Sequence, residues 1–297
     1  MKLAALDLGS NSFHLLVAVT DGAAELSKIG SHKEVLRLGN VVQLHGQLTD
    51  EAFKRALACV GRSAAVAQEL GAEKLLAVAT SALRDARNGQ AFCDACIDRF
   101  GVPIELVSGD EEANLAYRGA RSALKLTTGR VLVADIGGGS VELGVGDGAH
   151  CDNAQSLQLG FLRLSHAFRL SDPGGAQRMA RYVQRECEKA RWQLGRFDTL
   201  LLSGGTARAI GKLLGGGIAG ASATQAMKLC EELSRSSPDK LIKRGVDKHR
   251  AESLAAGAAV TAGLIAGFGQ REVRISPRGL REGVILRELS RRATRAA

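Results

Sequence analysis

Aromatic residues and prolines are scarce in this 297-residue chain: Phe, Trp and Tyr make up 4% of it, and only four residues are proline. Any core must therefore be built from Leu, Val, Ile and Ala, and a hydrophobic content of 45% is enough for real cores. No run of about 18 uninterrupted apolar residues occurs, so we expect no transmembrane helix. The 36 glycines are typical of an α/β protein with many tight turns rather than of a disordered chain.

The beginning of the chain also lacks the basic region and the long apolar core of a secretory signal. We therefore expect a cytoplasmic protein, in which the six cysteines are reduced. Cys93 and Cys96 have the spacing of a metal or redox motif, but no second pair is near and the segment is typical of a helix. We expect neither a zinc site nor a redox site there.

Positive charge is in excess, because 40 Lys and Arg residues against 31 Asp and Glu residues give a net charge of +9. Such a surface favours polyanionic partners and speeds their encounter. Nucleic acid is not expected, because the basic residues are spread out and neither an aromatic stacking platform nor a nucleic-acid-binding motif is present. An inorganic polyanion fits equally well, and a basic surface without a specific partner is the alternative.

The most informative stretch is rich in glycine and contains a carboxylate at the end of an apolar run. Residues 131–134 are apolar and lead into Asp135. Three glycines follow at 137–139, then Ser140 and an alternating segment over 141–145. This pattern predicts a strand, a tight turn and a second strand. Unobstructed glycine amides can bind an anion, and a carboxylate beside them suits a divalent cation. The alternative is a glycine-rich hairpin with an incidental acid.

The same pattern occurs a second time near the start of the chain. Within residues 5–17, Asp7 corresponds to Asp135 and Ser12 corresponds to Ser140. Two such units suggest two similar half-molecules, and the chain is long enough for two domains of ordinary size. If the halves face each other, two phosphate-binding turns and two carboxylates close on one cleft. An incidental hairpin does not explain this repetition.

The paired hairpins resemble the two phosphate-binding elements of the actin, hexokinase and heat-shock-chaperone superfamily. Within it, residues 7–14 and 135–142 closely resemble the exopolyphosphatase/guanosine pentaphosphate phosphatase family. Four further segments resemble that family in the same order, so the resemblance spans nearly the whole chain. They are Ala-Thr-Ser-Ala-Leu-Arg-Asp-Ala at 79–86, Ser-Gly-Asp-Glu-Glu-Ala at 108–113, Ser-Gly-Gly-Thr at 203–206 and Gly-Leu-Arg-Glu-Gly at 279–283.

The resemblance implies an α/β protein with two ribonuclease-H-like domains that flank a cleft. We expect an N-terminal domain over residues 1–126 and a C-terminal domain over residues 127–297, whose last helix packs back across the interface. Longer family members carry an additional C-terminal helical domain that this sequence lacks. Without that domain, tight binding of long substrate chains and channels formed by a dimer are in doubt. The sequence does not decide whether the protein forms a homodimer.

Elsewhere the pattern predicts ordinary elements. Two strands are expected over residues 24–31 and 33–38, and a polar, glycine-punctuated loop is expected over 39–48. A helix follows, with Thr49 or Asp50 as its N-cap. These predictions rest only on the spacing of apolar and turn-forming residues.

Three acids, Asp110, Glu111 and Glu112, stand at the start of a predicted helix. A favourable interaction with the helix dipole is sufficient to explain them. The resemblance implies instead that Glu112 orients or deprotonates a water molecule. Glu111 is the neighbour most easily confused with it. On a helix the two side chains point about 100° apart, so only one of them can face a cleft squarely.

The resemblance also implies a catalytic set of Glu112, Asp135 and Glu142. Mg²⁺ or another divalent cation would be held by Asp7, Asp135 and Glu142, although a Glu on an alternating strand can also face solvent. Arg84 in isolation is typical of a surface residue, whereas the resemblance implies that it binds phosphate. The expected phosphate-binding residues are Ser10, Asn11, Ser12, Arg84, Gly137, Gly138, Gly139, Ser140, Gly205 and Thr206.

Three further positions keep two interpretations each. The amides of Gly205 and Thr206 could hold a distal phosphate or could simply begin a helix. Arg281 could bind an anion or could be a surface arginine in a turn. His14 occupies the position that Glu142 takes in the second copy and could be structural or catalytic, and we interpret it as a structural residue.

These residues predict a hydrolase that removes the terminal phosphate of inorganic polyphosphate and releases orthophosphate, without a covalent intermediate. Hydrolysis of the 5′ γ-phosphate of guanosine pentaphosphate is the alternative, which a guanine pocket would distinguish. A kinase of the superfamily is disfavoured by segments 79–86 and 108–113. A non-catalytic polyphosphate or nucleotide sensor is disfavoured by Glu112 together with both aspartates. We expect no membrane partner.

Overall fold

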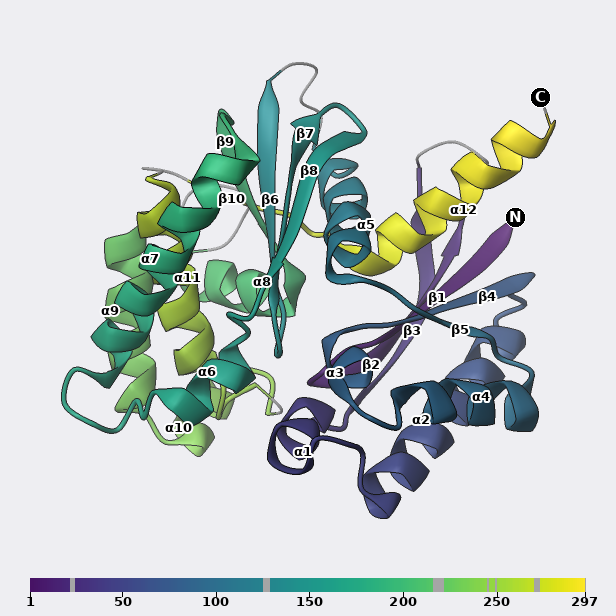
Figure 1. The fold of residues 1–297 in the computed structure, drawn as a ribbon, viewed down its shortest axis with the longest axis horizontal. Helices are drawn as coiled ribbons and strands as arrows, with labels where there is room; N and C mark the ends of the chain where they lie inside the picture. Colours follow the sequence, from purple (N-terminus) through teal and green to yellow (C-terminus); the bar gives the residue numbers. More distant parts are fainter. Residues whose placement is uncertain are drawn as a thin grey trace.

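The two predicted hairpins each begin a five-stranded mixed sheet, and the two sheets lie side by side in the molecule (Figure 1). The structure is a computed structural model that describes residues 1–21, 25–124, 129–215, 222–244, 246–248, 250–269 and 273–296. The predicted α/β architecture of two ribonuclease-H-like halves is confirmed. The predicted boundary between residues 126 and 127 lies outside the described residues.

Both sheets have the same strand order. Each consists of three consecutive antiparallel strands, a fourth strand that pairs in parallel with the first, and a fifth that pairs in parallel with the fourth. The order β3-β2-β1-β4-β5 of one sheet therefore matches the order β8-β7-β6-β9-β10 of the other. The repeat seen in the two hairpins therefore extends through the whole of each sheet. The strands are β1 (Lys2–Leu8), β2 (Ser12–Val19), β3 (Ser27–Val35), β4 (Lys74–Ala79), β5 (Ile104–Leu106), β6 (Arg130–Ile136), β7 (Val141–Asp147), β8 (His150–Leu157), β9 (Thr199–Ser203) and β10 (Arg274–Ile275).

The helices fill the connections between strands and cover both faces of each sheet. None of the helices that the structure describes combines the length and the apolar character that a bilayer crossing requires. They are α1 (Leu38–His45), α2 (Asp50–Glu69), α3 (Ser81–Asp85), α4 (Gly89–Phe100), α5 (Gly109–Arg121), α6 (Phe161–Ala167), α7 (Gly175–Leu194), α8 (Gly204–Leu213), α9 (Ala223–Ser234), α10 (Pro238–Lys243), α11 (Leu254–Phe268) and α12 (Leu280–Ala296).

The first sheet is buried on both faces because apolar residues occupy successive positions of its central strand. Successive side chains of a strand point to opposite faces. Ala4 and Leu6 of β1 pack into the core formed with α2 and α4, whereas Leu3 and Ala5 pack against α12. The last helix of the chain thus completes the core of the first half.

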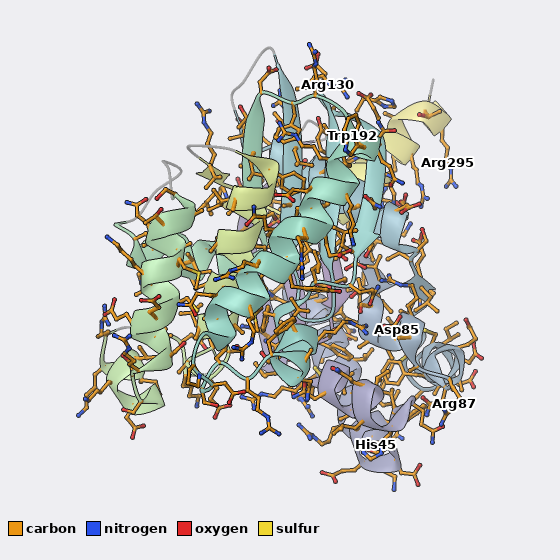
Figure 2. The ribbon with its side chains drawn as sticks, turned by 60° about the vertical axis from the view of Figure 1, so that its left-hand side comes forward. His45, Asp85, Arg87, Arg130, Trp192 and Arg295 are labelled. Atoms are coloured by element: carbon orange, nitrogen blue, oxygen red, sulfur yellow. The ribbon has the colours of Figure 1, made fainter. Side chains whose placement is uncertain are left out.

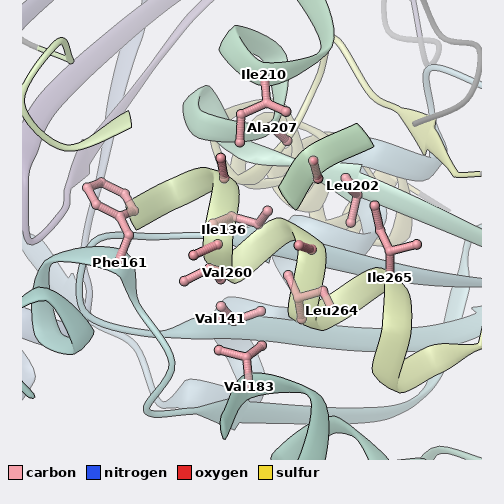
Figure 3. Packing of buried hydrophobic residues seen from close by; sticks show 14 of the residues in the cluster. Ile136, Val141, Phe161, Val183, Leu202, Ala207, Ile210, Val260, Leu264 and Ile265 are labelled. Carbon is pink, nitrogen blue, oxygen red and sulfur yellow. The ribbon is translucent and has the colours of Figure 1, made fainter. Parts of the chain in front are cut away.

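The second sheet has its larger core on the side of α7, α9 and α11 (Figure 3). Ile136 and Val141 of the sheet pack there with Val260 and Leu264 of α11. Nearly every residue of α11 is buried, and its glycines allow α7 to approach closely, since a Cβ at Gly263 would lie 2.5 Å from the Ala180 carbonyl oxygen. Close packing of small residues thus substitutes for the aromatic residues that the sequence lacks.

Helices α5 and α12 cross between the two sheets, and each covers the sheet of the opposite half (Figure 1). Helix α5 follows the first sheet in sequence, but its Tyr117 packs on Val131 and Val133 of the second sheet. At the crossing, a Cβ on Gly119 would collide with the Gly279 carbonyl group and would lie 2.7 Å from the Gly283 nitrogen. The two halves therefore touch backbone to backbone at this point.

Two element predictions were wrong. In place of the two strands expected over residues 24–31 and 33–38, the structure has one strand, β3, because its pairing with β2 continues past His32. The pairing has a single irregularity, at Val17 and Ala18 of β2. Residue 24 lies outside the described residues. The loop expected over 39–48 contains helix α1, which follows Arg37 in the left-handed conformation with φ of 53°.

A side chain at the helix crossing should destabilise the protein. Replacing Gly119 with Ala forces a methyl group into the backbone of α12, and overpacking of this kind costs about 1–3 kcal/mol. Chemical denaturation would measure the change. Gly61→Ala in α2 is the control, because the nearest atoms there belong to the partly exposed ring of Phe100 and Ala favours a helix by up to ~1 kcal/mol. Equal stability of the two variants would contradict the close crossing.

Candidate functional site

A cleft of about 840 Å³, counting the part open to solvent, lies where the two halves meet. The turns of both hairpins, the ends of β1 and β6, and the beginnings of α8 and α12 all reach it. The lining residues of the predicted site are Asp7, Ser10, Asn11, Ser12, Glu112, Asp135, Gly137, Gly138, Gly139, Ser140, Glu142, Gly205 and Thr206. Of the residues predicted for the site, Arg84 alone does not line this cleft.

The first turn is held by the chain segment that leads into α1. The carbonyl oxygen of Asn11 accepts hydrogen bonds from the backbone amides of Leu36 and Arg37, at 3.1 and 2.9 Å. The Ser10 carbonyl oxygen accepts one from Gly39 at 2.8 Å. These carbonyl groups therefore point away from the cleft into the first half.

The second turn lies against the first across the cleft. Its ends are joined by a hydrogen bond from the Gly137 amide to the Ser140 carbonyl oxygen, at 3.1 Å. A Cβ on Gly139 would lie 2.7 Å from the Ser10 hydroxyl oxygen and would collide with that of Ser81, whereas one on Gly138 would approach Asn11. Glycine is thus required here because the two turns are nearly in contact.

Three carboxylates lie at the ends of the strands that carry these turns. Asp7 of β1 is paired with His14 of β2, and Asp135 of β6 is paired with Glu142 of β7 in the equivalent register. Burial raises the pKa of Asp7 to about 7, with Asp135 raising it further and Arg281 opposing. Burial likewise raises the pKa of Asp135 and raises that of Glu142 to about 8.

Glu142 is 2% exposed and accepts a hydrogen bond from the Ser156 hydroxyl at 3.0 Å. The Ser140 hydroxyl also hydrogen-bonds to it, and both bonds partly oppose the raising of its pKa. Glu142 therefore does not face solvent, the alternative that its place on an alternating strand allowed.

Glu112 lies in the cleft at the beginning of α5 and is 7% exposed. Burial and the neighbouring Glu142 raise its pKa well above the usual value, and Arg84 opposes the shift. Arg84 donates from Nη1 to Glu112 Oε2 and to the Val107 carbonyl oxygen, both at 3.0 Å. Glu111, by contrast, points away and pairs with Arg287 at 2.7 Å.

The donor chemistry of this acidic group fits a divalent cation. Asp7 Oδ1 is buried, and no described residue offers it a hydrogen bond. Within the described part of the chain, no three His, Cys, Asp or Glu side chains come close enough together to hold a metal ion, so the predicted set of Asp7, Asp135 and Glu142 is not assembled as three ligands of one ion. Mg²⁺ commonly takes one or two carboxylates and completes its shell with water and substrate phosphate. Asp7, Asp135 and Glu142 supply oxygen donors of that kind.

A cluster of four basic side chains lines the same cleft, and we call it the basic cluster. Lys33 comes from β3, Arg208 from α8, Arg250 from the segment before α11, and Arg281 from α12. Burial lowers the pKa of Lys33, Arg208 and Arg250, and each is lowered further by another cation of the cluster. Cations that repel one another in a partly buried site form a binding site for an anion of several charges.

Sequence reasoning missed most of the basic cluster. Arg281 lies in a segment that had suggested an anion site, but no local pattern marked Lys33, Arg208 or Arg250. In the structure the guanidinium group of Arg250 lies against Gly205, where a Cβ would collide with it. The sequence shows the glycine but gives no indication that Arg250 approaches it.

His14 also faces the cleft, although we interpreted it as structural. Burial lowers its pKa to about 2, and Arg281 and Lys33 lower it further. The imidazole is therefore neutral and adds no charge where the second half has the carboxylate Glu142.

The raised pKa of Glu142 predicts a pH-dependent stability. The unfolded state loses the proton near pH 4.5, whereas the folded state keeps it to about pH 8, so the carboxyl group progressively destabilises the fold across that window. Glutamine carries no charge at any pH. The melting temperature of Glu142→Gln minus that of the wild type, measured in a chelator, should therefore rise between about pH 4.5 and 8. A difference that stays constant with pH would contradict the buried carboxyl group.

Comparison with known proteins places the chain in a family. The sequence matches the model of the Ppx/GppA phosphatase family over residues 15–292. Exopolyphosphatase 1 of Mycobacterium leprae is 31% identical, over 99% of this chain and 91% of that protein, and its Mycobacterium tuberculosis counterpart is 30% identical, over 99% and 90%.

Solved structures agree with the sequence match. The Ppx/GppA family member of Aquifex aeolicus is 26% identical with a TM-score of 0.82, and an exopolyphosphatase of Cytophaga hutchinsonii is 25% identical with a TM-score of 0.85. Each alignment covers 98% of both chains. This chain belongs to the Ppx/GppA phosphatase family.

Proposed function

We propose that this protein hydrolyses the terminal phosphoanhydride bond of inorganic polyphosphate and depends on Mg²⁺ or a similar divalent cation. One observation carries the proposal. Buried and half-buried carboxylates, the turns of both hairpins and the basic cluster all line one cleft. A substrate that carries several phosphates matches this combination of groups. The names of the mycobacterial relatives, exopolyphosphatase 1, support the same substrate.

Glu112 is the proposed general base. A catalytic base works best when its pKa lies near the working pH, and burial together with Glu142 raises the pKa of Glu112 in that direction. Arg84 holds one of its oxygen atoms at 3.0 Å, which fixes the carboxylate in the cleft. The other oxygen atom is then available to accept a proton from the attacking water molecule.

The two turns would bind the terminal phosphates. Backbone N–H groups of Ser10 to Ser12 and of Gly138 to Ser140 provide donors of fixed orientation, which need no reorganisation as charge develops. Arg84, which the resemblance implied as a phosphate ligand, does not line the cleft and instead holds Glu112. Gly205 and Thr206 would add donors at the beginning of α8.

The divalent cation would be held by one or two of the carboxylates Asp7, Asp135 and Glu142, with water and substrate phosphate as its other ligands. When bound, it would neutralise charge on the phosphate oxygens and relieve the repulsion among the carboxylates. The buried Asp7 Oδ1 is the clearest position for it, because it has no hydrogen bond from the described residues.

The basic cluster favours polyphosphate over guanosine pentaphosphate, the alternative substrate. Lys33, Arg208, Arg250 and Arg281 offer cationic groups to phosphates beyond the terminal one. Guanine would be recognised by an aromatic surface or by polar groups in a pocket. Phe161 is the only Phe, Tyr or Trp among the described residues that line the cleft, and it is 4% exposed.

Replacing Glu112 tests the base directly. Glu112→Gln keeps the size of the side chain but cannot accept the proton, and general-base catalysis contributes roughly 10²–10⁴-fold. We expect kcat for orthophosphate release from tripolyphosphate to fall by about that factor. Glu111→Gln is the matched control, because that side chain pairs with Arg287 outside the cleft, and it should change kcat by no more than a few-fold.

The substrate is tested with the same release measurement on short and long polyphosphate, guanosine pentaphosphate and ATP, with Mg²⁺ present. We expect release from polyphosphate. Release confined to guanosine pentaphosphate would move the assignment to the alternative. Intact binding without release from any of the four would contradict a hydrolase and leave a sensor.

The basic cluster generates a separate prediction. Lys33→Met removes a cation that we expect to contact substrate, and a hydrogen bond to a charged group contributes about 1.5–3 kcal/mol. The KM for tripolyphosphate should rise about 10- to 100-fold, with a smaller change in kcat. Lys54→Met, on the exposed side of α2, removes the same charge away from the cleft and should leave KM unchanged. Similar KM values for both variants would indicate only a general effect of net charge.

A further inference from the structure

All three glycine carbonyl groups of the second turn are held by helix α6. The amide of Phe161 donates to the Gly137 carbonyl oxygen at 3.3 Å, and the amide of Leu162 donates to that of Gly138 at 2.9 Å. The third bond comes from a side chain, because Arg163 Nε donates to the Gly139 carbonyl oxygen at 2.9 Å. The turn is thus held along its whole length from the side that faces α6.

These bonds determine where the turn directs its N–H groups. In a planar trans peptide the carbonyl group and the following N–H point in opposite directions, and the described residues contain no cis peptide. Carbonyl groups held by α6 therefore direct the amides of Gly138, Gly139 and Ser140 away from α6. Gly160 allows this contact, since a Cβ there would collide with the backbone of Gly138 and Gly139.

Arg163 also joins the turn to the other half of the molecule. Its Nη2 atom lies 2.7 Å from Asp85 Oδ2 in α3. The preceding residue of α3 is Arg84, which holds Glu112. Two adjacent residues of α3 thus connect to the two sides of the site, Arg84 to the proposed base and Asp85, through Arg163, to the phosphate-binding turn.

We propose that Arg163 is a positioning residue for phosphoryl transfer and that Asp85 acts through it. Arg163 keeps the Gly139 peptide oriented so that the Ser140 amide faces the substrate phosphate, and Asp85 orients the guanidinium group. The inference rests on the proposed phosphoanhydride hydrolysis. It assigns a catalytic effect to two residues that lie outside the reacting groups.

The competing explanation is an ordinary ion pair. Asp85 and Arg163 are about one-third exposed, and pairs of that kind contribute about 0–1 kcal/mol to stability. The chain provides a close match elsewhere. Arg130 donates from Nε to the Arg196 carbonyl oxygen at 3.1 Å and from Nη1 to Asp152 at 2.6 Å, with similar exposure. Figure 2 shows Arg130 well apart from Asp85.

The experiment compares Arg163→Gln with Arg130→Gln. Each variant loses one hydrogen bond to a backbone carbonyl oxygen and one ion pair with an aspartate. A small misplacement of a catalytic group can reduce the rate by 10²-fold, so Arg163→Gln should lower kcat for tripolyphosphate about 10- to 100-fold. Arg130→Gln should leave kcat unchanged. Equal kcat values for the two variants would overturn the proposal.

Arg163→Lys separates positioning from folding. Lysine keeps the positive charge near Asp85, but its single nitrogen atom cannot hold both the carboxylate and the Gly139 carbonyl group. The melting temperature should stay close to that of the wild type while kcat remains at least about tenfold lower. Recovery of kcat together with the melting temperature would indicate a merely structural ion pair.

Asp85 is tested by combination. Asp85→Asn should lower kcat less than Arg163→Gln, because the bond from Arg163 to Gly139 remains. The double variant should have the kcat of Arg163→Gln alone, since Asp85 acts through the arginine. Effects that multiply would show that Asp85 acts independently and would overturn this part of the proposal.

A binding measurement separates this proposal from the proposed function. In a Glu112→Gln background, calorimetry with tripolyphosphate and Mg²⁺ should show a Kd about tenfold higher after Arg163→Gln and unchanged after Arg130→Gln. If the wild-type protein releases no orthophosphate but this shift in Kd is observed, the hydrolase is rejected while the role of Arg163 in positioning the turn is supported. Hydrolysis without any difference between the two variants would reject only the role of Arg163. Absence of binding would overturn both.

Discussion

The cleft depends on holding like charges together out of water. Glu142 is buried and Asp7 and Asp135 are half-buried, all three with raised pKa values, while the pKa values of Lys33 and Arg208 in the same cleft are lowered. Each group alone opposes folding, because desolvated charges of one sign repel. A divalent cation relieves the acidic group and a polyanion relieves the basic cluster. Ligand binding therefore recovers the free energy of folding that this charge repulsion costs. For that reason the site favours a multiply charged ligand over water.

The duplication of the half-molecule explains why the two sides of the cleft differ. The hairpins have equivalent registers, yet Asp7 is paired with His14 whereas Asp135 is paired with Glu142. The imidazole of the first half is neutral and adds no negative charge beside Lys33 and Arg281, which both lower its pKa. The equivalent place in the second half holds the carboxylate Glu142, next to Asp135. A difference of residue type at one register position thus gives the second hairpin two carboxylates and the first hairpin one.

Local chemistry determined what could be predicted from the sequence. The two hairpins were predicted because glycine, aspartate and apolar alternation are adjacent in sequence, and the cap of α2 was predicted because Thr49 stands directly before its helix and accepts a bond from Ala52. Helix α1 was missed because it begins after a non-glycine residue in the left-handed conformation, with no capping side chain. Lys33, Arg208 and Arg250 of the basic cluster were missed for another reason: they come from β3, α8 and the segment before α11, and only tertiary folding brings them together.

The crossing of α5 and α12 connects the architecture to the chemistry. Glu112 lies in the first turn of α5, a helix that belongs to the first half in sequence but packs on the sheet of the second half. Arg84, which holds Glu112, comes from the first half. The position of the proposed base relative to both turns is therefore set by the distance between the halves, and that distance is set where glycines let the two helices touch. Bulkier residues at this helix crossing would hold the two halves farther apart. Glu112 and the two turns would then no longer reach the same phosphate.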